Sequence, residues 1–403
     1  MFVLEYKLRG HQNQFKAIDE AIRTVQFVRN KCVRYWMDGK HISQKDIYRH
    51  VTQLRKEYSF VKKLNSTACQ QACERSWTAI SKFYNNCKKQ IKGKKGYPKF
   101  SKRTRSFELK QSGWKLDRNN KKITFTDGNN IGTLKLVGSR DIDYFQEFQI
   151  KRVRVVKKAD SYFVQFLLRL DLRDITPELP RTKKMVGIDM GLNYFYADSD
   201  GNYVENPRYY RKAEKRLNRL NRLKSRKFKK GKPVSNNYLK ARKRYSKAHL
   251  KVSRQREEFA KTEALRLIES NDLIAYEDLK VKNLVRNSKL SKSINDAGWS
   301  QLRKWIEYFG LKHNKLTIAV SPEYTSQDCS NCGKRMKKSL SVRTHVCSCG
   351  FVCDRDTNAA LNIFKKATAG HTGSWSELID RNAWGDLSST VVGSDTCHSK
   401  TSQ

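Results

Sequence analysis

The chain has 403 residues, of which 84 are Lys or Arg and 39 are Asp or Glu, so its formal net charge is +45. A compact fold with this surplus repels itself, which predicts a polyanionic partner. No apolar run reaches the roughly 18 residues that span a bilayer, and no signal peptide opens the chain. We therefore expect a cytoplasmic protein that binds nucleic acid and has no membrane partner.

The first part of the chain predicts strands around a helical segment. Residues 2–9 alternate apolar and polar side chains, as a strand does. From His11 the apolar residues recur at helical steps, and we expect helices from there, across 42–55 and across 66–86, the last with Ile80 and Tyr84 inward. Strands are expected at 121–126, 132–137, 148–157 and 162–171. These patterns predict a small β-barrel over 1–10 and 101–180, interrupted by a helical region over 11–100.

A basic stretch joins the helical and β regions. Residues 88–105 carry nine basic residues and no acid, beside Tyr97 and Phe100. A solvated linker and a phosphate-contacting linker with aromatic platforms are comparable interpretations. The candidate contacts are Lys94, Lys95 and Lys99.

A second basic stretch is longer. Residues 211–256 contain twenty Lys or Arg and the single acid Glu214, within a helical segment expected over 208–268 and hinged at 230–233. Such a run is often a solvated face, but the lack of balancing acids favours a nucleic-acid surface. The candidate contacts are Arg211, Lys212, Lys215, Arg216, Arg219, Arg222, Lys240, Arg242, Lys243 and Arg244.

Residues 181–322 have an alternating β/α pattern. Strands are expected at 185–191, 271–279 and 316–320, with a helix around 299–309. Asp189 and Glu277 end the first two strands, and strand ends beside glycine are where an open sheet presents metal-binding carboxylates. The alternative for each acid alone is a turn cap or an ion pair.

The cysteines are clustered rather than spread. Five of the ten lie between 329 and 353, which predicts thiolate metal ligands in a reducing compartment. Cys329-x-x-Cys332 and Cys347-x-Cys349 give two short arms, an arrangement typical of a structural tetrahedral zinc site over residues 323–352. The second spacing is tight, so His345 or Cys353 is an alternative ligand. Cys69 and Cys73, one helical turn apart with no other ligand pair nearby, are interpreted as core thiols.

A third acid follows the second cysteine pair. Asp356, with Asp354 in reserve, precedes an alanine-rich helix start. Together with Asp189 and Glu277 it could bind two Mg²⁺ or Mn²⁺ ions, the hard cations that carboxylates select, for phosphodiester cleavage.

These motifs resemble those of the TnpB family of transposon-encoded RNA-guided nucleases, which are related to type V CRISPR effectors. The matching residues are 187–191 (Gly-Ile-Asp-Met-Gly), 276–279 (Tyr-Glu-Asp-Leu), the cysteine pairs and 354–362 (Asp-Arg-Asp-Thr-Asn-Ala-Ala-Leu-Asn). The resemblance implies an α/β multidomain protein. One part would be an RNase H-like RuvC domain with an inserted zinc knuckle, whose last segment is residues 353–370. The other would be a wedge β-barrel interrupted by a helical recognition lobe.

The resemblance also implies the activity and the partners. Asp189, Glu277 and Asp356 match the family's metal-binding acids, and one protein per guide RNA would cut double-stranded DNA beside a short flanking motif, at the nucleoid. The tight Cys347-x-Cys349 spacing departs from the family pattern. Residues 371–403 fall outside the resemblance, and their composition predicts a disordered tail. In this family the guide-RNA scaffold often overlaps the end of the reading frame, so we expect the encoded RNA to determine the sequence of this tail more than protein function does. Two alternatives are a zinc-containing accessory protein of transposition without catalysis and an unguided RuvC-like resolvase.

Overall fold

The computed structural model describes residues 2–138, 142, 145–146, 149–171, 173–337, 339 and 342–369. The chain divides into two compact units, Met1–Asp171 and Leu172–Gln403. No helix in the described part of the chain is long and apolar enough to cross a membrane. The predicted disordered tail, 371–403, lies outside the described residues.

The first unit is built on one seven-stranded antiparallel sheet in the order β2-β6-β7-β1-β5-β4-β3. Its strands are β1 (Phe2–Arg9), β2 (Ser106–Leu109), β3 (Trp114–Asp117), β4 (Lys122–Phe125), β5 (Gly132–Val137), β6 (Ile150–Lys157) and β7 (Tyr162–Leu168). β1 buries every second side chain and pairs with both β5 and β7, so the N-terminal strand lies at the centre. Among the strands that the structure describes, β2 and β3 are the edges of the sheet and do not pair with each other. The predicted barrel is therefore an open half-barrel.

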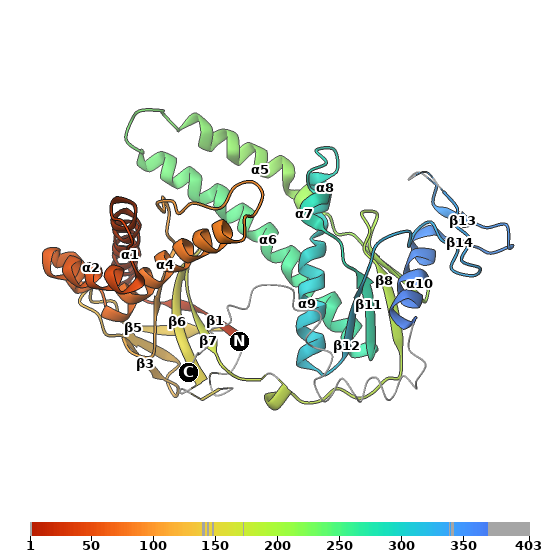
Figure 1. Cartoon of the computed structure of the whole chain (residues 1–403), viewed down its shortest axis with the longest axis horizontal. Helices are drawn as coiled ribbons and strands as arrows, with labels where there is room; N and C mark the ends of the chain where they lie inside the picture. Colours follow the sequence, from red (N-terminus) through yellow and green to blue (C-terminus); the bar gives the residue numbers. More distant parts are fainter. Residues whose placement is uncertain are drawn as a thin grey trace. The chain divides into compact units, whose positions relative to one another are not determined.

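Helices occupy the chain between β1 and β2 (Figure 1). They are α1 (Gln12–Asp38), α2 (Gln44–Glu57), α3 (Ser59–Lys63) and α4 (Ser66–Lys88). Cys69 and Cys73 are fully buried in α4, which confirms them as core thiols. The prediction for Tyr84 was wrong, because its ring is 46% exposed while its hydroxyl accepts a hydrogen bond of 2.8 Å from Trp36 Nε1.

The second unit contains a five-stranded sheet in the order β10-β9-β8-β11-β12. The strands are β8 (Met185–Asp189), β9 (Tyr194–Asp198), β10 (Tyr203–Glu205), β11 (Leu273–Glu277) and β12 (Leu316–Val320). β8, β11 and β12 are parallel, whereas β9 and β10 form antiparallel neighbours. Its helices are α5 (Tyr209–Arg226), α6 (Asn236–Ser270), α7 (Val281–Leu284), α8 (Ser291–Ala297), α9 (Trp299–Lys312) and α10 (Arg355–Thr368).

The two faces of this sheet are covered by different helices. Alternate residues of β11 point to opposite faces. Ile274 and Tyr276 pack in one core with residues of α6 and α9, whereas Leu273 and Ala275 pack in another with residues of α10. Figure 1 shows α10 beside β8 in this unit.

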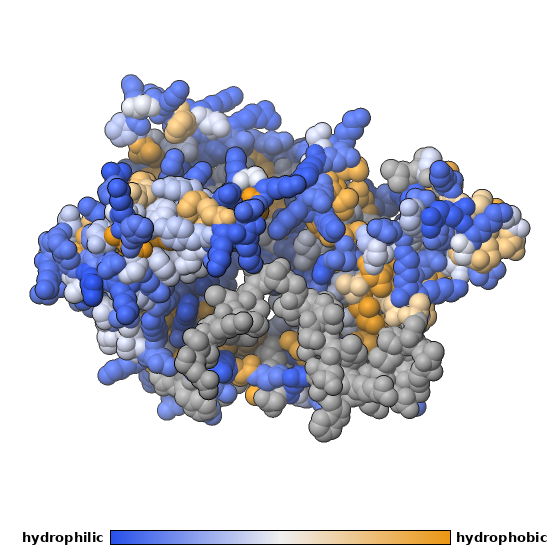
Figure 2. All heavy atoms as spheres, viewed as in Figure 1, coloured by the Kyte–Doolittle hydropathy of each residue, from blue (hydrophilic) through white to orange (hydrophobic). Residues whose placement is uncertain are grey.

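The basic segment forms two packed helices. α5 ends at Arg226 and α6 begins at Asn236, so the predicted hinge at 230–233 lies in their connection. Leu217 of α5 and Ala241 of α6 are buried, and the Lys224 ammonium lies 4.3 Å from the centre of the Tyr245 ring. Hydrophilic side chains dominate this part of the visible surface (Figure 2).

Candidate functional site

Two of the predicted acids end neighbouring strands. Asp189 is the last residue of β8 and Glu277 is the last residue of β11. The two strands are parallel, with Tyr276 opposite Ile188, so the register carries Glu277 level with Asp189 at the same sheet edge. By the alternation along each strand, both acids share the sheet face that α10 covers.

The third acid reaches this edge on α10. Asp356 lies in the first turn of the helix, whereas Asp354 is the N-cap and accepts hydrogen bonds from the Asp356 N–H at 2.8 Å and the Thr357 N–H at 3.4 Å. A Cβ on Gly187 would meet the Ala360 carbonyl oxygen at 2.3 Å, so α10 approaches β8 as closely as only glycine permits. Asp354 is thus committed to capping, and Asp356 is the acid left to face the sheet.

Burial raises the pKa of all three carboxyl groups. Burial raises the pKa of Asp189 most, and the charges of Glu277 and Asp356 raise it further. Burial also raises the pKa of Glu277, although a hydrogen bond from the Thr325 hydroxyl lowers it in part. Burial raises the pKa of Asp356 as well, although the charge of Arg343 lowers it in part. Acids that resist ionisation because they lie together and out of water form a site that a cation stabilises.

Oxygen ligands of this kind suit Mg²⁺ or Mn²⁺. Among the described residues, the four cysteines are the set of metal-ligating side chains whose ligand atoms all lie within 4.8 Å of one another. The three carboxylates are not so tightly gathered, and the Asp356 carboxylate instead forms an ion pair of 3.3 Å with Arg343. Arg343 therefore competes for the acid that a cation would need.

The four predicted thiols Cys329, Cys332, Cys347 and Cys349 converge. Cys329 Sγ lies 3.8 Å from Cys349 Sγ, and Cys332 Sγ lies 3.6 Å from Cys347 Sγ. Zn–S bonds of about 2.3 Å in a tetrahedron require sulfurs about 3.8 Å apart, so the cluster fits a structural zinc ion. A hydrogen bond from the Cys349 N–H, together with contacts to the neighbouring thiols, lowers the pKa of the Cys347 thiol to about 6, which favours the thiolate that zinc binds.

The alternative ligands are outside this cluster. His345 and Cys353 stand opposite each other in the hairpin of β13 (Thr344–Val346) and β14 (Val352–Asp354). Gly333 and Gly350 follow the two knuckles with positive φ angles of 77° and 85°, the left-handed conformation that lets each knuckle turn back. The tight second spacing therefore still presents both of its sulfurs to the cluster.

Two asparagines of α10 join the zinc cluster to the acids. Asn358 accepts from the Ser330 N–H at 2.9 Å and donates to the Asp328 carbonyl at 2.8 Å. Asn362 donates to the Asp328 carbonyl at 2.7 Å and to the Thr325 carbonyl at 2.8 Å. The first cysteine knuckle is thus fastened to the helix that carries Asp356. We call these two residues the asparagine clamp.

Sequence reasoning missed the asparagine clamp, Thr325 and Arg343. The clamp had a signal, because two asparagines four residues apart share one helix face and here lie among the buried Ala359 and Ile363. Thr325 and Arg343 had none, since their contacts with Glu277 and Asp356 depend on how distant loops fold.

The predicted basic contacts are mostly exposed. All six on α5 are exposed, as are Lys240, Lys243 and Arg244 on α6. Arg242 is half-buried, with its guanidinium 6.0 Å from the centre of the Tyr238 ring. Lys94, Lys95 and Lys99 are exposed between α4 and β2 in the first unit.

Two family models match the chain between residues 156 and 363. An OrfB model of the IS605 group, described as "Probable transposase", covers residues 156–288, and a Cas12f1-like TNB domain covers residues 299–363. A Streptomyces pristinaespiralis protein named "Putative RNA-guided DNA endonuclease" is 29% identical over 91% of this chain and 89% of its own. "Putative RNA-guided DNA endonuclease InsQ" from Escherichia coli strain K12 is 28% identical over 75% of this chain and 74% of its own.

One solved structure has the same fold over most of both chains. The mini-RNA-guided endonuclease CRISPR-Cas_phi3 matches with a TM-score of 0.50, 11% identity and 93% of each chain covered. Shorter sequence matches include proteins named TnpB-like. The resemblance found in the motifs is confirmed, because the chain matches an IS605-type OrfB model followed by a Cas12f1-like TNB domain and is similar over most of its length to proteins named as RNA-guided DNA endonucleases.

Proposed function

We propose that the protein is an RNA-guided DNA endonuclease that cuts DNA complementary to a bound guide RNA, next to a short flanking motif. Two proteins that match this chain over most of their length are named as putative enzymes of this kind. The observation that carries the proposal is the meeting of Asp189, Glu277 and Asp356 at one edge of a sheet, where burial raises the pKa of each.

The catalytic unit would be a RuvC-type nuclease. The sheet order β10-β9-β8-β11-β12, antiparallel then parallel, is consistent with an RNase H-like domain. Asp189, Glu277 and Asp356 would hold Mg²⁺ or Mn²⁺, and two such ions would activate a water and stabilise the leaving oxygen. Thr325 orients the Glu277 carboxylate through its hydroxyl, and Arg343 must release Asp356 when metal binds.

The remaining parts would hold nucleic acid and keep the site in shape. The half-barrel would be the wedge domain, and α1 to α4 the recognition lobe. The exposed cations of α5, α6 and residues 94–99 would contact phosphates of guide RNA and target DNA. We propose one protein per guide RNA, acting at the nucleoid. The zinc cluster has all four positions filled by protein, so its role would be structural.

The experiment is to purify the protein with its own RNA, sequence that RNA, and offer a plasmid matched to it. Cleavage that needs the match and Mg²⁺ is expected. A bound RNA without any matched cleavage would favour the accessory role, and cleavage of branched DNA without RNA would favour a resolvase.

A further inference from the structure

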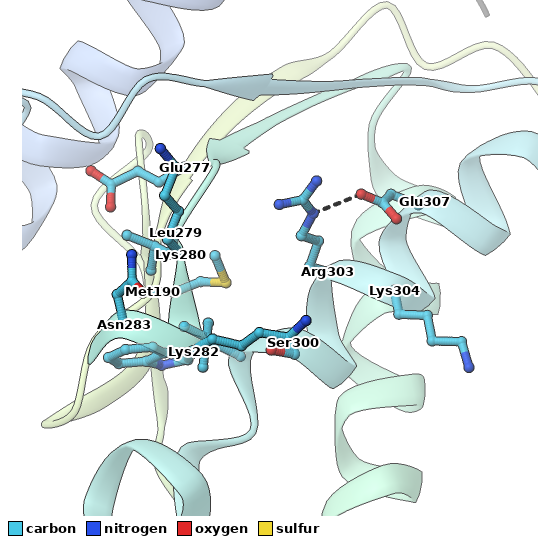
Figure 3. Close-up of a pocket in the computed structure, with 12 residues that line it drawn as sticks. Met190, Glu277, Leu279, Lys280, Lys282, Asn283, Ser300, Arg303, Lys304 and Glu307 are labelled. Atoms are coloured by element: carbon cyan, nitrogen blue, oxygen red, sulfur yellow. Dashed lines mark hydrogen bonds and ion pairs between the residues drawn. The ribbon is translucent and has the colours of Figure 1, made fainter. Parts of the chain in front are cut away.

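A cavity of about 440 Å³ opens beside Glu277 (Figure 3). Its walls come from the end of β11, the following segment through α7, and the first turns of α9. Glu277 and Lys280 lie on one side, Arg303 with its bond to Glu307 lies on the other, and Lys282 extends between them toward Ser300 (Figure 3). The cavity thus shares one proposed catalytic acid with the nuclease site.

The cavity has an apolar part that is held rigid. Met190 and Trp299 line it and are only 5% and 7% exposed, and Leu279 lies beside them. The Trp299 indole N–H donates to the Gly191 carbonyl at 3.1 Å, which fixes the ring next to the strand that carries Asp189. A preformed apolar surface that includes an aromatic ring is one against which a nucleobase can pack.

The cavity is also lined by lysine side chains that could bind an anionic ligand. Arg303 is already committed, to Glu307 at 2.7 Å and to Asp278. Lys280 and Lys282 are exposed, and in the part of the chain that the structure describes no acid forms an ion pair with either. Two ammonium groups beside an apolar surface match a phosphate attached to a nucleoside.

We propose that this cavity binds the nucleotide of the DNA strand that adjoins the cleaved phosphodiester. The inference rests on the proposed nuclease function, because Glu277 belongs to both sites. Its volume is within the range of pockets that enclose small ligands. Lys280 and Lys282 hold the flanking phosphate, and the surface of Met190, Leu279 and Trp299 receives the base or sugar. The nucleotide is thereby fixed while the neighbouring phosphate meets the acids.

The direct test is photocrosslinking in the complete complex with guide RNA and target DNA, using Asp189→Ala to prevent turnover. 5-Iododeoxyuridine is placed in turn at each position around the cut. One position next to the cut is expected to crosslink to a peptide that contains Met190 or Trp299. Crosslinks from these positions to other peptides alone, or crosslinks to this peptide from iodouridine in the guide RNA instead, would overturn the proposal.

Kinetics gives a second test. Lys280→Ala/Lys282→Ala is expected to raise KM for DNA at least tenfold with little change in kcat, and to reduce the slope of log KM against log salt by about 0.7 per lost contact. Ser300→Trp is expected to block the cavity and slow cleavage at least tenfold. Lys289→Ala removes one exposed charge outside the cavity and is the matched control.

The outcomes separate the two proposals. If the unmodified protein does not cut matched DNA, the nuclease function fails. If it cuts, and the double lysine variant cuts with the KM and salt slope of Lys289→Ala, the cavity proposal alone fails. Zinc content and the thermal unfolding midpoint of each variant confirm that the fold is intact.

Discussion

The asparagine clamp makes a prediction that follows from its hydrogen bonds. Asn358 is fully buried, and its side chain is the hydrogen-bond acceptor for the buried Ser330 N–H. Asn358→Ala leaves that N–H without its partner, which costs about 1–3 kcal/mol. The Asp328 carbonyl keeps its bond from Asn362, so it adds little to the cost.

The assay is hydrogen exchange of the knuckle amides. About 1–3 kcal/mol of local destabilisation corresponds to roughly 5- to 150-fold faster exchange at Ser330. Asn358→Ala/Asn362→Ala also strips the Asp328 carbonyl of both donors, so its effect should exceed the sum of the single effects by about 1 kcal/mol. Because Thr325 lies in the same fastened loop and donates to Glu277, slower cleavage is expected to accompany the faster exchange.

Asn295→Ala is the matched control. Asn295 also donates to a backbone carbonyl, that of Ser291 at 2.8 Å, but it is exposed, so water replaces the lost bond. Its effect should stay within about 0.5 kcal/mol. Unchanged exchange at residues 325–330 in Asn358→Ala, with the fold intact, would refute the role of the clamp.

Four further predictions concern the metal, the buried ion pair, its dependence on pH and the basic helices. Cys332→Ser should lose zinc, measured by metal analysis, and loosen the segment around the acids; full cleavage without zinc would contradict this. Lys315→Met should cost about 3–5 kcal/mol, because it leaves Asp272 buried without its cation, and Lys315→Met/Asp272→Leu should recover most of it by thermal unfolding. Burial raises the pKa of Asp272, but Lys315 and the Thr182 N–H lower it more, so the folded-state pKa is below its ordinary value. The stability that this pair contributes is therefore present above the unfolded pKa of about 4 and is lost as pH falls through the folded pKa. An Asp272→Leu/Lys315→Met protein whose stability falls with acid in the same way would contradict this prediction. Neutralising Lys215, Arg216, Arg219 and Arg222 should flatten the salt dependence of duplex binding by about 0.9 per lost phosphate contact, and an unchanged slope would make this face merely solvated.

The positions of Asp189 and Glu277 at the ends of neighbouring strands could be predicted because their signal is local. A strand that ends in a carboxylate is visible in the sequence, and parallel neighbours bring such ends together without further detail. The cysteine knuckles are equally local, since two sulfurs one or two residues apart must face the same way. These local features are enough to predict the strand-end positions of Asp189 and Glu277 and the clustering of the four thiols.

The rest depends on contacts between distant segments. Gly187 admits the backbone of α10, a close approach that the pattern of β8 alone does not predict. Within the described residues, the sheet is an open half-barrel because its edge strands β2 and β3 do not pair, and the pattern of a single strand does not predict which strands become its neighbours. Tyr84 was predicted on the inner face of its helix, yet its ring is exposed and its hydroxyl accepts a hydrogen bond from the Trp36 indole. This orientation depends on tertiary packing, which the helical pattern does not show.

The central claim is that the three acids together perform the cleavage. The measurement is Mg²⁺-dependent cutting of guide-matched plasmid by Asp189→Ala, Glu277→Ala and Asp356→Ala, with guide-RNA binding measured on the same preparations. Each substitution is expected to abolish cutting and leave RNA binding near normal, whereas Asp354→Asn, which can still cap α10, should keep cutting. Retained cutting by Asp189→Ala and Glu277→Ala would contradict the account.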